Sequence, residues 1–354
     1  MPLTPPADIP TDAALVAALV EAQHPDLAGP LRLVSDGWDN QLYRLGDCHA
    51  VRIPRREVAA HLIEHEQQML PGIAARVQAR VPVPVRVGVP SDAFPFAWSI
   101  VEWVDGIDGA SVSAGERSGL AVPLAAFVGE LAVPAPDAPR NPVRGVPLSA
   151  RAEVVGTRLL SLSGRIEVAA LEHAWRQALA APEWDGPPLL LHGDLHPGNL
   201  LLTHPARWSS EAARSDAATP APRGGAQKER EAILRPQRRG SLRPRAEPAT
   251  EDSATPAPGE PATEDSGLAA VLDFGDVTSG DPATDLATAW LTFDGEARER
   301  FRSALPVAPD AATWRRARGW AVTMGSALAM SSDDNPRMAA LARHTLDQIG
   351  EDAE

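Results

Sequence analysis

A short polar segment between two apolar runs contains the residue types from which a catalytic site can be built. The apolar runs, residues 189–191 and 200–202, each have the length of a short buried strand. The polar and special residues between them are His192, Gly193, Asp194, His196, Pro197, Gly198 and Asn199. The Asp194 carboxylate could orient and deprotonate a hydroxyl group, and the amide oxygen of Asn199, five positions later, could bind Mg²⁺. The segment therefore predicts a loop that combines a base with a metal ligand.

A second carboxylate, Asp273, follows another apolar strand and is itself followed by Phe274 and Gly275. Transfer of a γ-phosphoryl group needs metal ions on the phosphate oxygens, and Asp273 could supply a second metal ligand. Asp273 lies 74 positions after Asn199, but 62 of these positions form a low-complexity segment, residues 205–266. Only 12 positions remain without this segment. We therefore expect the two strands to form a hairpin-like pair that brings both metal ligands to one place.

These motifs resemble those of the aminoglycoside and macrolide phosphotransferase family, the small-molecule branch of the protein-kinase-like fold. Residues 192–199 resemble the catalytic loop of that family. Residues 280–287, Gly-Asp-Pro-Ala-Thr-Asp-Leu-Ala, resemble its signature after the metal-binding Asp. The resemblance begins at about residue 31–33, ends at about residue 330 and is interrupted by the low-complexity segment. It implies that Asp194 is the base or orienting group, that Asn199 and Asp273 bind Mg²⁺, and that ATP or GTP is the co-substrate.

The resemblance also implies an α+β fold with two lobes. Residues 1–104 would form an N-terminal nucleotide-binding lobe, with a small antiparallel sheet and a helix. Residues 105–354 would form a larger, mainly helical C-terminal lobe for catalysis and substrate binding. Residues 205–266 interrupt this lobe and contain almost no large apolar residues, so we expect this insertion to be disordered.

Three short strands are predicted near the N-terminus, at residues 31–34, 41–45 and 49–53. The turn between the first two strands contains Gly37. In the kinase-like fold this turn covers the nucleotide phosphates with backbone N–H groups, and a glycine permits close approach. An ordinary Asp-Gly hairpin turn accounts for the same residues equally well.

Arginine must take any role that kinases give to lysine, because the only lysine, Lys228, lies in the insertion. Arg52 stands on the third strand, where kinases place the lysine that contacts the α and β phosphates. Glu66 falls within the apolar stripe of a helix predicted from about residue 56 to 70. A buried carboxylate needs a cationic partner, so we expect an Arg52–Glu66 ion pair. Two alternatives are a surface position for Arg52 and an inward Glu64 in a shifted helix phase.

The link between the lobes is predicted to follow two further strands. Residues 81–89 alternate valine and contain prolines, which confine this strand to an edge or end of the sheet. Residues 96–104 form a buried strand, and the resemblance implies that backbone groups of Glu102 to Val104 bind the purine. Trp103 either closes over the base or belongs to the core.

The rest of the chain has helical patterning. Apolar residues recur with helical spacing in five segments, residues 120–131, 165–181, 282–293, 314–330 and 337–349. The resemblance implies that Asp285, in the third segment, braces the backbone of the catalytic loop, and that His192 and His196 support the same loop. Exposed acids such as Asp276 or Asp294 could contact a cationic sugar.

Two other functions are compatible with parts of the sequence. His192, Asp194 and His196 alternate, as ligands on one face of a strand would, which favours a metal-dependent hydrolase. That hypothesis explains neither Asn199 nor the Asp273-Phe-Gly motif. The absence of a lysine outside the insertion and the weak glycine signal favour instead a kinase-like module that binds a nucleotide without turnover.

The net charge and the cysteine count of the chain limit its possible binding partners and its compartment. A formal charge of −14 over 354 residues argues against nucleic acid and anionic membranes and suits a neutral or cationic small molecule with a hydroxyl group. One cysteine, Cys48, fits a reducing compartment, and no signal sequence or spanning segment is visible. We therefore expect a cytoplasmic monomer or weak dimer. Residues 37–40 and 140–147 are macrolide-like, although a housekeeping acceptor is equally compatible, and the choice between ATP and GTP stays open.

Overall fold

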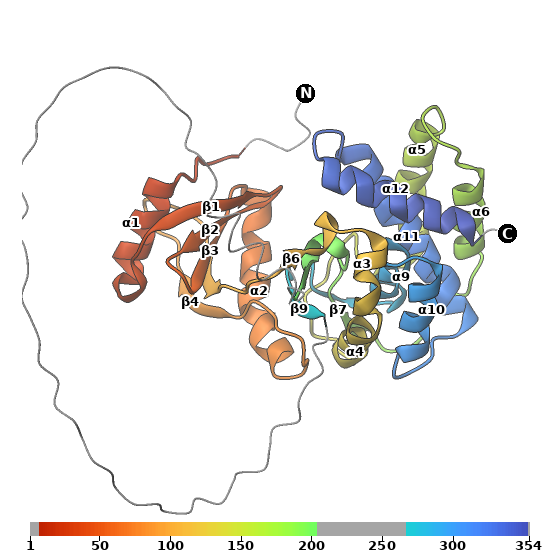
Figure 1. Cartoon of the computed structure of the whole chain (residues 1–354), viewed down its shortest axis with the longest axis horizontal. Coiled ribbons are helices and arrows are strands. Elements are labelled where there is room, and N and C mark those ends of the chain that lie inside the picture. Colours follow the sequence, from red (N-terminus) through yellow and green to blue (C-terminus); the bar gives the residue numbers. More distant parts are fainter. Residues whose placement is uncertain (1–6, 204–266, 353–354) are drawn as a thin grey trace, which may run out of the picture. The chain divides into compact units, whose positions relative to one another are not determined.

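The computed structural model describes residues 7–203 and 267–352 (Figure 1). The insertion predicted at residues 205–266, and the disorder expected of it, lie outside the described residues. Helices and strands are mixed along the chain, with an antiparallel sheet in the N-terminal part and mostly helices in the C-terminal part. The predicted α+β class is therefore confirmed.

A five-stranded antiparallel sheet has the order β1-β2-β3-β5-β4. Its strands are β1 (Leu31–Asp36), β2 (Asn40–Leu45), β3 (His49–Pro54), β4 (Pro84–Gly88) and β5 (Trp98–Glu102). The three predicted N-terminal strands are confirmed. The proline-containing strand β4 lies at the edge of the sheet, as expected for a strand with missing N–H donors.

Two helices pack on this sheet (Figure 1). Helix α1 (Ala13–Gln23) begins at Asp12, whose carboxylate accepts a hydrogen bond from Leu15 N–H at 2.8 Å. Helix α2 (Glu57–Ala74) continues past its predicted end and contains Pro71. The predicted end was wrong because the apolar stripe continues to Ile73, which is buried, and this burial compensates for the lost hydrogen bond.

Two small sheets flank the loop at residues 192–199 that is predicted to be catalytic. The first pairs β7 (Leu189–Leu191) with β10 (Thr278–Gly280), and the second has the order β6-β8-β9, with β6 at Ile107–Asp108, β8 at Leu200–Leu202 and β9 at Leu268–Val271. Strands β8 and β9 are antiparallel, with Leu200 opposite Val271. This pairing confirms the hairpin-like arrangement expected around the insertion.

Helices make up most of the remaining described chain. They are α3 (Ala114–Arg117), α4 (Ala121–Leu131), α5 (Ala152–Leu162), α6 (Ala169–Leu179), α8 (Ala283–Leu286), α9 (Thr288–Thr292), α10 (Gly295–Ala304), α11 (Ala311–Ser331) and α12 (Pro336–Glu351). Helices α11 and α12 lie side by side (Figure 1).

Three features of this part differ from the sequence prediction. Helix α6 begins four residues after the predicted start at residue 165, and α5 and α10 were not predicted. The helix predicted from Pro282 to Phe293 is divided at Ala287 into α8 and α9. Every residue of α8 and α9 is buried, so packing on all sides, and not one apolar stripe, shapes this segment.

The buried side chains form two apolar clusters. One joins α1 to the five-stranded sheet and includes Val16, Tyr43 and Trp98. The other runs through the C-terminal helices and small sheets, and the end of α2 reaches it through Leu70 and Ile73. The boundary between lobes at residue 104 stays a prediction. Among the described residues, every helix is too short or too polar to cross a membrane.

Candidate active site

The candidate catalytic loop, residues 192–199, is a tight turn between β7 and β8, and its shape depends on Gly193. Gly193 has φ 87°, a left-handed conformation that side chains rarely adopt. A Cβ atom on Gly193 would lie 2.4 Å from the backbone oxygen of Asp276. The loop therefore packs directly against the segment that follows Gly275.

Asp285 and His192 fix the loop backbone. The buried Asp285 carboxylate accepts hydrogen bonds from the N–H groups of His192 (2.7 Å) and Gly193 (2.9 Å). Burial nevertheless raises the pKa of Asp285. His192 Nε2 donates to the Leu272 oxygen at 2.9 Å, while its Nδ1 accepts from Asp194 N–H at 3.2 Å. These partners require the neutral Nε2–H tautomer, and both ring nitrogens of His192 are therefore engaged.

The Asp194 carboxylate lies between two nitrogen donors. Arg144 Nη2 is 2.8 Å from Oδ1, and His196 Nε2 is 3.3 Å from Oδ2. The other nitrogen of His196, Nδ1, accepts from Gly198 N–H at 3.0 Å. Burial alone would raise the pKa of Asp194, but Arg144 and His196 together hold it well below its ordinary value. Asp194 is therefore a charged carboxylate that can accept further hydrogen bonds.

Asn199 and Asp273 flank the paired ends of β8 and β9. Leu272 N–H donates to the Asn199 oxygen at 2.8 Å, so Asp273 is one residue beyond a direct contact with Asn199. The amide nitrogen of Asn199 donates to the Asp194 backbone oxygen at 2.9 Å, and Oδ1 is the atom that could bind a cation. Asp273 has φ 62° and a side chain that is 47% exposed. Carboxylate and amide oxygens are hard ligands, so this donor set fits Mg²⁺.

Arg52 joins the sheet, α2 and Asp273. Its Nη2 is 2.8 Å from Glu66 Oε1 and 3.0 Å from Asp273 Oδ1. Glu66 is 2% exposed, as its place in the apolar stripe predicted, so the ion pair is present and Glu64 is not the inward acid. Burial raises the pKa of Glu66 to about 7, because Arg52 compensates only in part. The contact between Arg52 and Asp273 was not anticipated from the sequence.

The turn between β1 and β2 is held by arginine. The N–H of Gly37 donates to the Asn40 oxygen at 3.0 Å, which closes the turn, and Arg55 Nη1 donates to the Gly37 oxygen at 2.9 Å. The Gly37 N–H is therefore not available to a phosphate. The N–H groups of Trp38 and Asp39 have no hydrogen bond within the described part of the chain, and they are the donors that this turn can offer.

The segment predicted to bind a purine leaves β5 at Glu102. The Trp103 N–H donates to the Cys48 oxygen at 2.8 Å, so it is not available to donate a hydrogen bond to a purine. The Trp103 ring packs against the Arg44 guanidinium, whose carbon lies 4.2 Å from the ring centroid. The Val104 backbone has no hydrogen bond in residues 7–203 and 267–352, so Val104 and the Glu102 oxygen remain the candidates for base recognition.

The interpretation of His192, Asp194 and His196 as a metal cluster is wrong. Both nitrogens of His192 have backbone partners, and the Nδ1 of His196 is also engaged. No group of three or more His, Cys, Asp or Glu side chains among the described residues is arranged to bind a metal ion. The two histidines instead support the loop.

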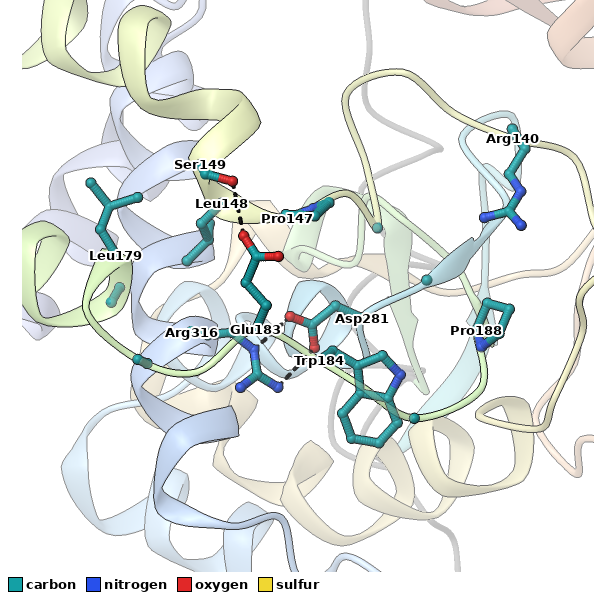
Figure 2. A pocket seen from close by; sticks show the side chains of 15 residues that line it. Arg140, Pro147, Leu148, Ser149, Leu179, Glu183, Trp184, Pro188, Asp281 and Arg316 are labelled. Atoms are coloured by element: carbon teal, nitrogen blue, oxygen red, sulfur yellow. Dashed lines mark hydrogen bonds and ion pairs between the residues drawn. The ribbon is translucent and has the colours of Figure 1, made fainter.

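A cavity of about 280 Å³ lies beside the β7–β10 pair and is separate from the predicted catalytic residues (Figure 2). Figure 2 shows the buried ion pair between Arg316 and Asp281, with Nε 2.7 Å from Oδ2. Asp281 also accepts from Ala283 N–H at 3.0 Å, although Pro282 occupies the N-cap position of α8. The Asp281 carboxylate therefore both caps the start of α8 and forms a structural ion pair.

Sequence reasoning missed Arg144, Asn141 and the place of Asp276. Asn141 Nδ2 donates to Asp276 Oδ1 at 2.8 Å, and Arg144 Nε lies 3.7 Å from Asp276 Oδ2. Residues 140–147 stood out as macrolide-like, but nothing in an irregular loop indicates where a side chain points. Asp294, the other acid considered for substrate, instead caps α10 through Ala297 N–H at 3.1 Å.

A sequence model of the phosphotransferase enzyme family matches residues 30–210 and 262–320. The GDP complex of wild-type aminoglycoside 2'-phosphotransferase-IIIa is similar at 14% identity and a TM-score of 0.63, over 97% of this chain and 100% of that chain. Macrolide 2'-phosphotransferase MphH from Brachybacterium faecium is similar at 19% identity and a TM-score of 0.51, over 95% and 98% of the two chains.

A third solved structure, the streptomycin–ATP–APH(2")-IIa ternary complex, is similar at 15% identity and a TM-score of 0.51, over 94% and 95% of the two chains. No curated protein sequence matches the chain. At these identities the solved structures establish the fold, and they confirm the predicted protein-kinase-like architecture. The family match covers more than half of the sequence, and it confirms the resemblance on which the site residues were chosen. The chain belongs to the phosphotransferase enzyme family.

Proposed function

We propose that this protein is a Mg²⁺-dependent enzyme that transfers the γ-phosphoryl group of ATP or GTP to a hydroxyl group of a small molecule. The observation that carries the proposal is the convergence of distant residues on one place. Asn199 contacts the Asp194 backbone at 2.9 Å, Asp273 follows the strand paired with Asn199, and Arg52 is 3.0 Å from Asp273. A charged acid, two hard oxygen ligands and a guanidinium are the components that phosphoryl transfer requires.

Asp194 would act on the acceptor hydroxyl. The hydroxyl oxygen forms a bond to the γ-phosphorus, the bond from the γ-phosphorus to the bridging oxygen breaks, and the nucleoside diphosphate leaves. The hydroxyl proton passes to Asp194. Since the pKa of Asp194 lies well below its ordinary value, Asp194 first orients the hydroxyl by accepting its hydrogen bond. It takes the proton only late, which suits a loose transition state with little bond formation to the acceptor.

The remaining residues would hold the nucleotide. Mg²⁺, when bound to Asn199 and Asp273, would neutralise the β and γ phosphates. Arg52 would contact the phosphates while Glu66 keeps its guanidinium in place. The turn that contains Gly37 would cover the phosphates, and the backbone of Glu102 and Val104 would bind the base.

The acceptor class is an aminoglycoside or a macrolide antibiotic. Two structures of similar fold carry aminoglycosides in their names, gentamicin and streptomycin, and MphH is named as a macrolide 2'-phosphotransferase. Both antibiotic classes carry basic amines. The formal charge of −14 on this chain favours such cationic acceptors.

The direct test is incubation of the purified protein with Mg²⁺ and either ATP or GTP, against a panel of macrolides, aminoglycosides and small amino alcohols. We expect one class to gain the mass of a phosphoryl group, and we expect chelation of Mg²⁺ to abolish the product. Asp194→Asn should lower kcat by about 100- to 10,000-fold, because it removes the proton acceptor.

Asp137→Asn is the matched control, because Asp137 is an exposed acid outside the site. It should retain full turnover. Tight nucleotide binding without any phosphorylated product would contradict the proposal and favour a binding module. Full turnover in the Asp194→Asn variant would contradict the role given to Asp194.

A further inference from the structure

The loop between α4 and α5 is organised around Asn141. Its Oδ1 accepts hydrogen bonds from the N–H groups of Val143 (2.9 Å) and Arg144 (3.1 Å). Its N–H donates to Thr278 Oγ1 at 3.1 Å, and its Nδ2 donates to Asp276 at 2.8 Å. One side chain thus folds the loop and fastens it to the segment after Gly275.

Two glycines allow the same loop to approach the backbone of β10 closely. Gly145 has φ 67°, and its oxygen accepts from Asp281 N–H at 3.2 Å. A Cβ atom on Gly280 would lie 2.0 Å from the Gly145 oxygen. Because β10 pairs with β7, which leads into the catalytic loop, this close contact sets where Arg144 stands relative to Asp194.

Arg144 lies between two carboxylates. It is 2.8 Å from Asp194 Oδ1 through Nη2 and 3.7 Å from Asp276 Oδ2 through Nε. Its side chain is 19% exposed, and its buried Nε has no hydrogen-bond partner. The described residues include no lysine that could supply this charge instead. A guanidinium holds its donors in one rigid plane, a geometry that the ammonium group of lysine does not reproduce.

We propose that Arg144 is a positioning residue of the transfer reaction, which holds the Asp194 carboxylate in the orientation that receives the acceptor hydroxyl. The inference rests on the proposed function. Asp194 carries four lone-pair sites, so a bond from Arg144 to Oδ1 fixes the carboxylate plane and leaves other sites for the acceptor. Asp276 adds a second, longer ion pair to Arg144, with Oδ2 3.7 Å from Nε.

The test compares Arg144→Gln and Arg144→Lys with the control Arg140→Gln. Arg140 belongs to the same loop, is exposed, and has no hydrogen bond or ion pair in the described part of the chain (Figure 2). We expect Arg144→Gln to lower kcat by about 100-fold, the size of effect that a displaced reacting group produces. Nucleotide affinity should stay within about twofold, because Arg144 is not assigned to the nucleotide. Arg144→Lys should recover part of kcat, and Arg140→Gln should match the parent protein.

Crystal structures of the parent protein and Arg144→Gln provide a readout that does not depend on turnover. We expect the Asp194 carboxylate to rotate toward His196 when Arg144 is absent. An unchanged Asp194 orientation would overturn the inference, whether or not the parent protein is active. A parent protein that phosphorylates none of the acceptors would contradict only the proposed function. A kcat of Arg144→Gln equal to or above that of the parent would also overturn it, and an increase would identify Arg144 as an inhibitory plug.

Discussion

Two arginines in this protein each lie between two carboxylates, and they are positioned in different ways. Arg52 contacts Glu66 and Asp273 at 2.8 and 3.0 Å, and Arg144 contacts Asp194 at 2.8 Å with Asp276 at 3.7 Å. Arg52 stands on β3 and its partner Glu66 on α2, both regular elements. Arg144 stands in an irregular loop whose shape depends on side-chain hydrogen bonds from Asn141.

Different kinds of interaction hold the two arginines in place. Arg52 is fixed by the packing of α2 on the sheet, and Glu66 is almost fully buried with it. Arg144 is fixed by a few polar contacts and by the approach of Gly145 to β10. We therefore expect substitutions at Arg52 to affect stability and nucleotide binding together, and substitutions at Arg144 to affect turnover.

The largest effect is expected for Arg52→Met. This change leaves Glu66 buried without a cation, so Glu66 must either stay charged at a high cost or take up a proton. Unfolding by urea should show a loss of about 3–5 kcal/mol. Nucleotide affinity, measured by calorimetry, should fall at the same time. Arg52→Lys keeps the charge and should restore most of the stability. If both variants lose the same amount of stability, the shape of the guanidinium and not its charge matters at this position.

A large effect on stability alone is expected for Arg316→Met. Arg316 and Asp281 are 4% and 6% exposed, and Arg316 also donates to the Pro182 oxygen at 2.7 Å. Removal of one partner from such a buried pair should cost about 3–5 kcal/mol in urea unfolding. At a temperature where the variant remains folded, kcat should be unchanged. A selective loss of kcat would show that this third arginine belongs with Arg144 and not with the scaffold.

A smaller effect is expected for Gly280→Ala. The added methyl group would overlap the Gly145 backbone, so the loop that carries Arg144 must move away from β10. We expect a loss of about 1–3 kcal/mol in stability and a decrease in kcat. Gly156→Ala on α5 is the control, because nothing lies within 4 Å of its Cβ position, and it should stabilise the protein slightly. An unchanged kcat in Gly280→Ala would show that the position of the loop that carries Arg144 does not affect turnover.

The smallest effect is a pH dependence that comes from Glu66. Burial raises the pKa of Glu66 to about 7, so the folded state binds this proton more tightly than the unfolded state does. The stability contribution is therefore complete at acidic pH and is lost as the pH rises through about 7. Relative to Glu66→Gln, the parent protein should lose no more than about 1.4 kcal/mol per pH unit in this window. A difference that stays flat from pH 5 to pH 8 would show that Arg52 keeps Glu66 ionised throughout.

The sequence supplied much of the site because its residues lie on regular elements or in a compact motif. The position of Arg52 on the third strand and the apolar stripe of α2 were enough to predict the ion pair between Arg52 and Glu66. Removal of the insertion from the residue count was enough to place Asn199 and Asp273 beside the ends of two adjacent strands. Helix ends were less predictable, as α2 shows, since burial of Ile73 outweighs the local preference of Pro71.

The sequence by itself indicated the family and the fold class and supplied the residues proposed as the acid and the metal ligands, because periodicity and motif spacing are local properties of a chain. Tertiary structure alone decided that Arg144 rests on Asp194, that Arg52 reaches Asp273, and that Trp103 N–H is occupied by Cys48. These contacts join segments between 50 and 221 residues apart. No local sequence pattern predicts these contacts. Each one depends on how separate elements pack together and on which polar atoms still need a hydrogen-bond partner after packing.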